Sequence, residues 1–174
     1  AEHDAPEYVY GEVDFVSFIA LISLTKPKTH RCFYDLGSGI GKAVVACAMI
    51  YDMQAYYGVE LLQPLHAAAL AQKKRLEVIS TYTVRAQKIH FIQDDFLKTE
   101  FQESSLIFIH ATAFWGALWD QLQLHLRDKA SKAIIITISR KLEPQYFEIL
   151  HATHVLMSWG VATAYIQQLR LTNS

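Results

Sequence analysis

Short apolar runs typical of buried strands alternate with helical patterns along most of this chain, and this alternation constrains the fold more than any other feature. Strands that are separated by helices imply a mostly parallel sheet with helices on both faces. The strand-like runs in this part of the chain are residues 30–36, 55–60, 88–93, 105–111 and 132–139. The helical patterns cover residues 13–24, 42–51, 65–80 and 114–128. In the first of them, Phe15, Phe18, Ile19 and Ile22 lie on one face.

The alternation of strand-like and helical segments stops near the C-terminal end of the chain. Residues 151–159 and 163–171 both have strand-like composition, and only residues 160–162 separate them. This gap is too short for a helical crossover, so the two segments should pair as an antiparallel hairpin. We therefore expect an α/β fold whose mostly parallel sheet ends in an antiparallel hairpin.

The length of the chain favours one domain. It has 174 residues, and no repeat, low-complexity segment or linker divides it. We expect a single domain over residues 1–174, with a loop and a helix in residues 1–30 and an α/β core in residues 31–174.

The net charge and the search for targeting signals limit which binding partners and which cell compartment we expect. The formal net charge is −1, without a long run of like charge, so we do not expect direct binding to nucleic acid or to an anionic membrane. No apolar run is long enough to span a bilayer, and the N-terminal residues lack the basic and apolar parts of a signal peptide. Cys32 and Cys47 fall in segments that we expect to be buried, which favours free thiols over a disulfide. We expect a cytoplasmic protein.

The stretch YDLGSGIGKA, residues 34–43, joins a strand to a helix through a turn with three glycines. A nucleotide-phosphate loop needs a glycine five places before the glycine–lysine pair and a hydroxyl after it, but the chain has Leu36 and Ala43 at these positions. A dinucleotide turn needs a small residue where Lys42 stands, and Asp35 would repel a pyrophosphate. Neither of these two motifs matches.

An S-adenosylmethionine site fits the same turn better. The amino-acid end of this cofactor carries an ammonium, for which Asp35 is a partner, and a carboxylate, which the free N–H groups at the start of the next helix can bind. Glu60 ends the second strand, where a carboxylate can accept from both ribose hydroxyls. Asp94 or Asp95 can accept from the adenine amino group while Phe96 covers the ring. The alternatives are a tight turn without a ligand, a charge at a helix start for Glu60, and a helix cap or solvated charge for the other aspartate.

Five segments, in this order and at these spacings, resemble a known family. They are PEYVYGE (6–12), YDLGSGIGKAVVACA (34–48), YYGVE (56–60), DDFL (94–97) and SLIFIHATAF (105–114). The family is that of the DOT1-type, non-SET histone lysine methyltransferases, within the class I S-adenosylmethionine-dependent methyltransferases. The glycine motif is shared by the whole class, whereas VYGE is narrower. The resemblance implies a Rossmann-like fold with a seven-stranded sheet, S-adenosyl-L-methionine as cofactor, and a lysine side chain of a protein as substrate.

The resemblance also implies which residues form the site. The cofactor would lie against residues from three strand ends, namely Asp35, Gly37, Ser38, Gly39, Gly41, Glu60, Asp95 and Phe96. The loop around Tyr10 would close over the sulfonium, and the segment from His110 to Phe114 would line the substrate channel. We expect Tyr10, His110 and Phe114 to be the catalytic residues. Two positions depart from the family, which has an asparagine in place of His110 and a glutamine in place of Lys42.

Methyl transfer to lysine needs a neutral amine, and a narrow aromatic channel disfavours the ammonium form. Tyr10, Phe114 and Trp115 are candidate walls of such a channel, with ordinary core packing as the alternative for Phe114 and Trp115. His110 is a candidate base or hydrogen-bond partner of the acceptor, or a structural residue. The histidines have no metal-ligand spacing, so we expect no metal. Residues 139–142, SRKL, follow the last parallel strand and could meet an acidic partner.

Three functions remain open at this point. The leading hypothesis is a protein lysine N-methyltransferase of DOT1-like type. The alternatives are a small-molecule methyltransferase and a non-catalytic binding module that kept the fold, an idea motivated by the residues that replace the asparagine motif of the family.

Overall fold

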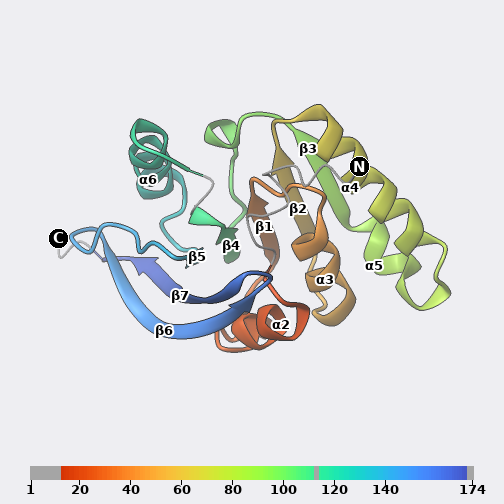
Figure 1. Cartoon of the computed structure of the whole chain (residues 1–174), viewed down its shortest axis with the longest axis horizontal. Coiled ribbons are helices and arrows are strands. Elements are labelled where there is room, and N and C mark those ends of the chain that lie inside the picture. Colours follow the sequence, from red (N-terminus) through yellow and green to blue (C-terminus); the bar gives the residue numbers. More distant parts are fainter. Residues whose placement is uncertain (1–12, 112–113, 172–174) are drawn as a thin grey trace.

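The computed structural model describes residues 13–111 and 114–171 and shows one seven-stranded sheet with helices on both faces (Figure 1). The strands are β1 (Cys32–Leu36), β2 (Ala55–Glu60), β3 (Ile89–Gln93), β4 (Ser105–Ile109), β5 (Ile134–Ile138), β6 (Phe147–Met157) and β7 (Gly160–Leu169). The α-helices are α2 (Phe15–Ser23), α3 (Lys42–Ile50), α4 (Gln63–Glu77), α5 (Thr83–Gln87) and α6 (Ala117–Lys129). Short 3₁₀ helices are η1 (Pro27–Thr29), η2 (Ser80–Tyr82) and η3 (Phe96–Lys98). The predicted α/β architecture is confirmed.

The strands lie in the order β3-β2-β1-β4-β5-β7-β6. The first five strands pair in parallel, and all residues of β1 and β4 are buried because helices cover the sheet on both sides. This is why these strands are continuous apolar runs in the sequence. β1 and β4 are neighbours although the chain leaves them toward opposite edges of the sheet, and ligands of such sheets bind at this switch point, outside the carboxyl ends of the strands.

The C-terminal hairpin is also confirmed, since β6 and β7 pair in antiparallel fashion and β7 joins the sheet beside β5. Its turn was predicted at residues 160–162, and this position is wrong. The turn consists of Ser158 and Trp159, and β7 already begins at Gly160. Both strands are therefore longer than predicted, and the tip of the hairpin reaches the N-terminal end of α2, where Val13 forms a bridge with Met157.

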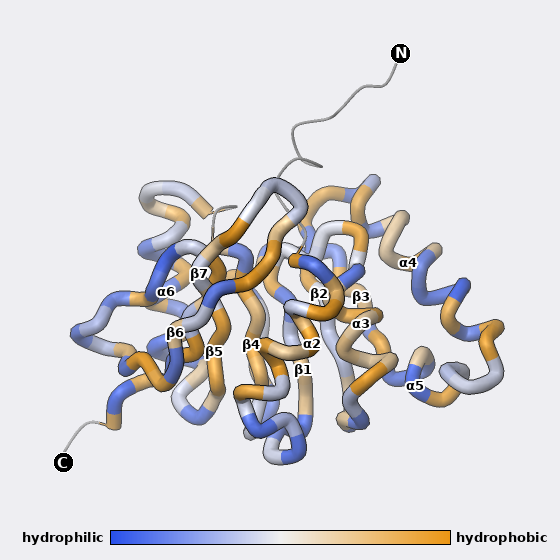
Figure 2. Tube along the Cα trace, turned by 60° about the horizontal axis from the view of Figure 1, so that its bottom comes forward, coloured by the Kyte–Doolittle hydropathy of each residue, from blue (hydrophilic) through white to orange (hydrophobic). Residues whose placement is uncertain are grey.

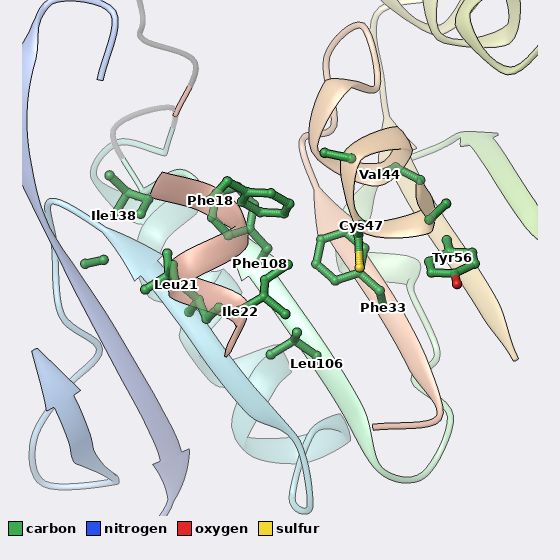
Figure 3. Close-up of a cluster of buried hydrophobic side chains, with 14 of the residues drawn as sticks. Phe18, Leu21, Ile22, Phe33, Val44, Cys47, Tyr56, Leu106, Phe108 and Ile138 are labelled. Atoms are coloured by element: carbon green, nitrogen blue, oxygen red, sulfur yellow. The ribbon is translucent and has the colours of Figure 1, made fainter. Parts of the chain in front are cut away.

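Two hydrophobic clusters hold the helices on the sheet, because successive strand residues point to opposite faces. On one face, Phe33 and Tyr56 pack with residues of α2 and α3 (Figure 3). Ala86 of α5 belongs to the same cluster. On the other face, Tyr34 and Ile107 pack with residues of α6, including Trp119. Figure 2 shows hydrophobic segments of the tube along the central strands. Cys32 and Cys47 are both free and buried, as predicted.

The helices begin where local chemistry favours a start. Asp14 caps α2, its carboxylate accepting from the backbone N–H of Ser17 at 3.2 Å. Pro64 stands in the first turn of α4, where its missing N–H costs nothing. The face predicted for α2 is partly wrong: Phe18, Leu21 and Ile22 are the buried residues, whereas Phe15 is 48% exposed. None of the helices in residues 13–111 and 114–171 is long and apolar enough to cross a membrane.

Candidate functional site

The turn between β1 and α3 depends on glycine at three positions. The φ angles are 77° at Gly37, 54° at Gly39 and 86° at Gly41, a backbone region that costs a residue with a Cβ roughly 1–2 kcal/mol. The backbone N–H groups of Gly37 and Ser38 both donate to the carbonyl of Val59, at 2.8 and 3.0 Å. These two bonds fix the turn against β2, so the ends of the two strands form one rigid edge.

A cavity of about 1030 Å³ lies at this edge, over the carboxyl ends of β1, β2 and β4. Six of the residues predicted for the cofactor line it, and so do two of the predicted catalytic residues. These are Asp35, Gly37, Ser38, Gly39, Glu60 and Phe96, together with His110 and Phe114. The structure thus brings together groups from four segments that are far apart in the sequence. Tyr10 lies outside the described residues.

Asp35 is the buried acid of the cavity. Its residue is only 5% exposed, although it lines the cavity at the end of β1. Burial, and to a smaller extent the negative charge of Glu60, raise the pKa of Asp35 from 3.8 to about 8. A carboxyl group in this position would be stabilised in its charged form by a cationic ligand.

Glu60 is oriented by two backbone donors. One of its oxygens, Oε1, accepts from the N–H of Gly39 at 3.0 Å, and Oε2 accepts from the N–H of Leu62 at 3.1 Å. Each carboxylate oxygen has a second lone pair. The side chain is therefore held in place by the protein and still has acceptor capacity on both oxygens for a pair of hydroxyls.

Gly41 and Gly58 have a packing reason for lacking a side chain. A Cβ on Gly41 would lie 2.5 Å from the ring of Phe91, and a Cβ on Gly58 would lie 2.7 Å from the same ring. Gly41 was predicted to bind the cofactor, but it is not among the described residues that line the cavity, and its contact with a cofactor stays a prediction. The buried hydroxyl of Ser38 also lies near β2, 2.8 Å from the Cβ position of Gly58.

The two aspartates after β3 have local partners. Asp95 caps η3, its Oδ1 accepting from the N–H of Leu97 at 3.0 Å. Asp94 accepts from the N–H of Asp95 at 2.7 Å and pairs with Lys98 at 3.7 Å. Neither carboxylate belongs to the described lining of the cavity, whereas Phe96 does. The role predicted for Asp95 in holding adenine stays a prediction, and its capping role is the one that the structure shows.

Two aromatic rings form one wall of the cavity. Phe96 and Phe114 pack edge to face, with ring centroids 4.7 Å apart and planes at 85°. The ring of Phe114 lies 3.3 Å from the Cβ position of Gly37. A side chain at Gly37 would push against this ring, so the glycine turn and the aromatic wall fit each other.

The predicted channel segment follows β4 directly. His110 lines the cavity, and Trp115 lines it with 71% of its surface exposed, as expected for a residue at the rim. Phe114 is 3% exposed and belongs to the core cluster as well as to the wall. Core packing of Phe114 is confirmed, whereas its role as a wall of a substrate channel stays a prediction.

Sequence reasoning missed the apolar part of the cavity. Phe15, Met49, Leu156 and Met157 also line it, from α2, α3 and the tip of the hairpin. Their proximity depends on the hairpin folding back over α2, which leaves no local signal in the sequence. Arg140, in the segment 139–142 that could meet an acidic partner, donates to the carbonyl of Phe114 at 2.9 Å, and the acidic partner stays a prediction.

In residues 13–111 and 114–171, no group of three or more His, Cys, Asp or Glu side chains is arranged to hold a metal ion.

Solved structures share this arrangement of strands and helices. An RNA methyltransferase from Salinibacter ruber, in complex with S-adenosyl-L-homocysteine, matches with a TM-score of 0.68 at 14% identity, over 94% of this chain and 97% of its own. Magnesium protoporphyrin IX methyltransferase from Synechocystis PCC 6803, with bound S-adenosylmethionine, matches with a TM-score of 0.66 at 11% identity, over 90% and 78%. The fold is that of the class I methyltransferases.

Within this class, the family model for the histone methylation protein DOT1 matches residues 3–166, and the chain belongs to the DOT1 family. A histone-lysine N-methyltransferase of Gibberella zeae, H3 lysine-79 specific, is 27% identical over 140 residues, which is 76% of this chain and 28% of that protein. The Caenorhabditis elegans protein of the same description is 29% identical over 146 residues, 80% of this chain and 15% of its own. The chain thus spans less than a third of the length of these relatives.

Proposed function

We propose that this chain is an S-adenosylmethionine-dependent protein lysine N-methyltransferase of DOT1 type. The observation that carries the proposal is the single cavity that joins a buried acid, an oriented acid and an aromatic wall: Asp35, Glu60 and the pair Phe96–Phe114. Membership of the DOT1 family supports it, as do structural relatives that bind this cofactor or its product.

The residues of the cavity fit the chemistry of this cofactor. Asp35 is a buried carboxyl whose charged form needs a cation, and the amino-acid end of S-adenosylmethionine provides an ammonium. Glu60 offers acceptors on both oxygens for vicinal hydroxyls. A Cβ on Gly39 would meet nothing within 4 Å, so the turn leaves open space at this point. Phe96 offers a ring edge or face to an apolar, planar group.

The cofactor, when bound, supplies a methyl group that is already activated by the sulfonium. What the chain supplies is alignment and exclusion of water. The buried ring of Phe114 and the rim residue Trp115 surround the segment where an acceptor would enter, and an apolar surrounding lowers the pKa of a lysine so that its amine is neutral. His110 lines the same space and is our candidate for hydrogen bonding to the acceptor amine.

The acceptor that we propose is a lysine on a protein, with histones as the first candidates. The relatives named as H3 lysine-79 specific support this choice. The absence of direct nucleic-acid binding, expected from the net charge of −1, stays a prediction, and so does the cytoplasmic location.

A second candidate function, a small-molecule methyltransferase, is favoured by one observation. The cavity continues beyond the strand ends into an apolar region lined by Phe15, Met49 and Leu156. With a volume of about 1030 Å³ in total, it has the size of a pocket that holds a small molecule as well as a cofactor.

Transfer of a labelled methyl group separates these functions. The chain is incubated with radiolabelled S-adenosylmethionine and, in parallel, with core histones, reconstituted nucleosomes, whole-cell protein and a metabolite extract. We expect label in a protein band that is stable to base and is lost when the lysines are chemically blocked beforehand. Label confined to the low-mass fraction would support the small-molecule function, and label in no fraction would contradict both.

A further inference from the structure

Arg140 is outside the described lining of the cavity, but it donates a hydrogen bond to Phe114, which belongs to that lining. It lies between β5 and β6, and its Nη1 donates to the carbonyl oxygen of Phe114 at 2.9 Å. The guanidinium also lies over the ring of Trp119, 4.6 Å from its centroid. Phe114 belongs to the segment after β4, and Trp119 belongs to the first turn of α6. One side chain therefore connects the channel segment to the helix that follows it.

Phe114 is the residue through which this bond reaches the site. Its ring is 3% exposed and fits between the Cβ position of Gly37, at 3.3 Å, and the ring of Phe96. Interiors are close-packed, so a shift of the Phe114 backbone must move this ring against both neighbours. His110 and Trp115, which line the cavity on either side of Phe114 in the chain, belong to the same segment.

We infer that Arg140 is a positioning residue, which fixes the channel segment by holding the carbonyl of Phe114 and so sets where the methyl acceptor meets the cofactor. This inference rests on the proposed function. Arg140 is not among the described residues that line the cavity, so it acts through Phe114 and not by contact with a ligand. The acidic partner predicted for this part of the sequence is not needed to explain its charge.

Two tasks at once require arginine at this position. The planar guanidinium can lie flat over an aromatic ring and donate at its edge, because its N–H groups lie in the plane of the fork. The compact ammonium of lysine can satisfy the ring or the carbonyl, but it cannot present the same flat face and edge together. Arg140→Lys therefore keeps the positive charge and removes the positioning.

The chain offers a matched control. Arg127 of α6 also stacks on an aromatic ring, 3.4 Å from the centroid of Tyr146, and neither residue belongs to the described lining of the cavity. Arg127→Lys removes a stacked guanidinium of the same kind without touching Phe114. Any effect that both variants share reports on stability, whereas an effect of Arg140→Lys alone reports on positioning.

The first test is hydrogen–deuterium exchange of the full chain, which needs neither cofactor nor acceptor. We expect exchange in peptides covering residues 111–118 to be faster in Arg140→Lys by about fivefold or more, with peptides from β1 unchanged. The same peptides should be unchanged in Arg127→Lys. Equal exchange in both variants, or acceleration over the whole chain, would overturn the inference.

The second test separates binding from alignment. We expect Arg140→Lys to lower kcat by about tenfold or more, because small misplacement of reacting groups is costly, while the Kd for S-adenosylmethionine changes by less than about threefold. An unchanged kcat, or a loss in proportion to a weaker Kd, would overturn the inference. A wild-type chain that binds no cofactor would instead refute the proposed function, and the exchange experiment would still decide whether Arg140 holds the segment.

Discussion

Glu60 accepts a hydrogen bond from the backbone N–H of Gly39 at 3.0 Å, and this contact ties the end of β2 to the glycine turn after β1. Because the second oxygen accepts from Leu62, the carboxylate has a fixed direction before any ligand arrives. Its charge also acts on Asp35, whose pKa it helps to raise. The two acids of the site are thus linked through one short turn.

Replacement of Glu60 by glutamine should break this link. An amide has one oxygen, so it can accept from only one of the two N–H groups and must face the other with its own donors. We expect Glu60→Gln to lower the free energy of unfolding by about 1–2 kcal/mol and to weaken S-adenosylmethionine binding by about tenfold or more. Urea unfolding and calorimetric titration measure both effects. Glu77→Gln is the control and should change neither, because Glu77 ends α4 outside the described lining of the cavity and makes only a weak pair with Lys73 at 3.9 Å. A Glu60 variant that behaves like it would refute the assigned role.

The buried acid should make stability depend on pH. The pKa of Asp35 rises from 3.8 to about 8 on folding, so its contribution to stability is full below about pH 4 and is lost as the pH rises toward 8. Asp35→Asn, which resembles the protonated form, should remove this slope. We expect the wild type to lose on the order of a few kcal/mol relative to the variant between about pH 4 and 8. The two proteins are compared by urea unfolding across this range, and parallel profiles would show that Asp35 does not titrate in this way.

Binding of a cationic ligand beside Asp35 should release a proton. A nearby positive charge lowers the pKa of the carboxyl, so the affinity for S-adenosylmethionine should increase as the pH rises toward 8. At pH 7 we expect release of about one proton per molecule bound, measured by titration in buffers of different ionisation enthalpy. The signal should vanish with S-adenosyl derivatives that lack the amino group. Heats that are independent of the buffer would argue against contact with the ammonium.

The glycines of the turn should differ in their sensitivity to alanine. At Gly41 the methyl group would lie 2.5 Å from the Phe91 ring and 3.1 Å from Ala69, in addition to the strain of φ = 86°. We expect Gly41→Ala to cost about 2–4 kcal/mol of stability and Gly39→Ala only about 1–2 kcal/mol, because a Cβ at Gly39 meets nothing within 4 Å. For cofactor binding we expect the reverse order, with Gly39→Ala weakening the affinity more than Gly41→Ala does. Equal effects of both variants on both measurements would mean that the turn acts as a unit.

The fold could be predicted because its parallel strands leave a strong local signal. β1 and β4 are buried on both faces and appear as continuous apolar runs, and the two C-terminal strand-like segments are too close in sequence for a helical crossover between them. The exact turn could not be predicted, because apolar residues continue on both sides of Ser158 and Trp159 without a clear break. The orientation of α2 was missed for a similar reason: Phe15 fits the helical period, but it faces the cavity and not the core.

In the site, only those residues could be predicted whose positions follow from the ends of strands. Asp35, Glu60 and Phe96 lie at or just after the ends of strands, as predicted. Gly41 and Asp95 instead have roles set by neighbours distant in the sequence or by a local cap. The ring of Phe91 explains Gly41, and no pattern around residue 41 could reveal it. The hydrogen bond from Arg140 to Phe114 also joins residues far apart in the sequence, 26 positions from each other, so no local pattern could predict it.

Calorimetric titration with S-adenosylmethionine tests most directly whether the acids at the ends of β1 and β2 hold this cofactor. We predict saturable binding of one molecule per chain, weakened by about tenfold or more in both Asp35→Asn and Glu60→Gln and unchanged in Glu77→Gln. No heat with the folded wild type, or equal affinity in all four proteins, would contradict a cofactor site built on these two acids.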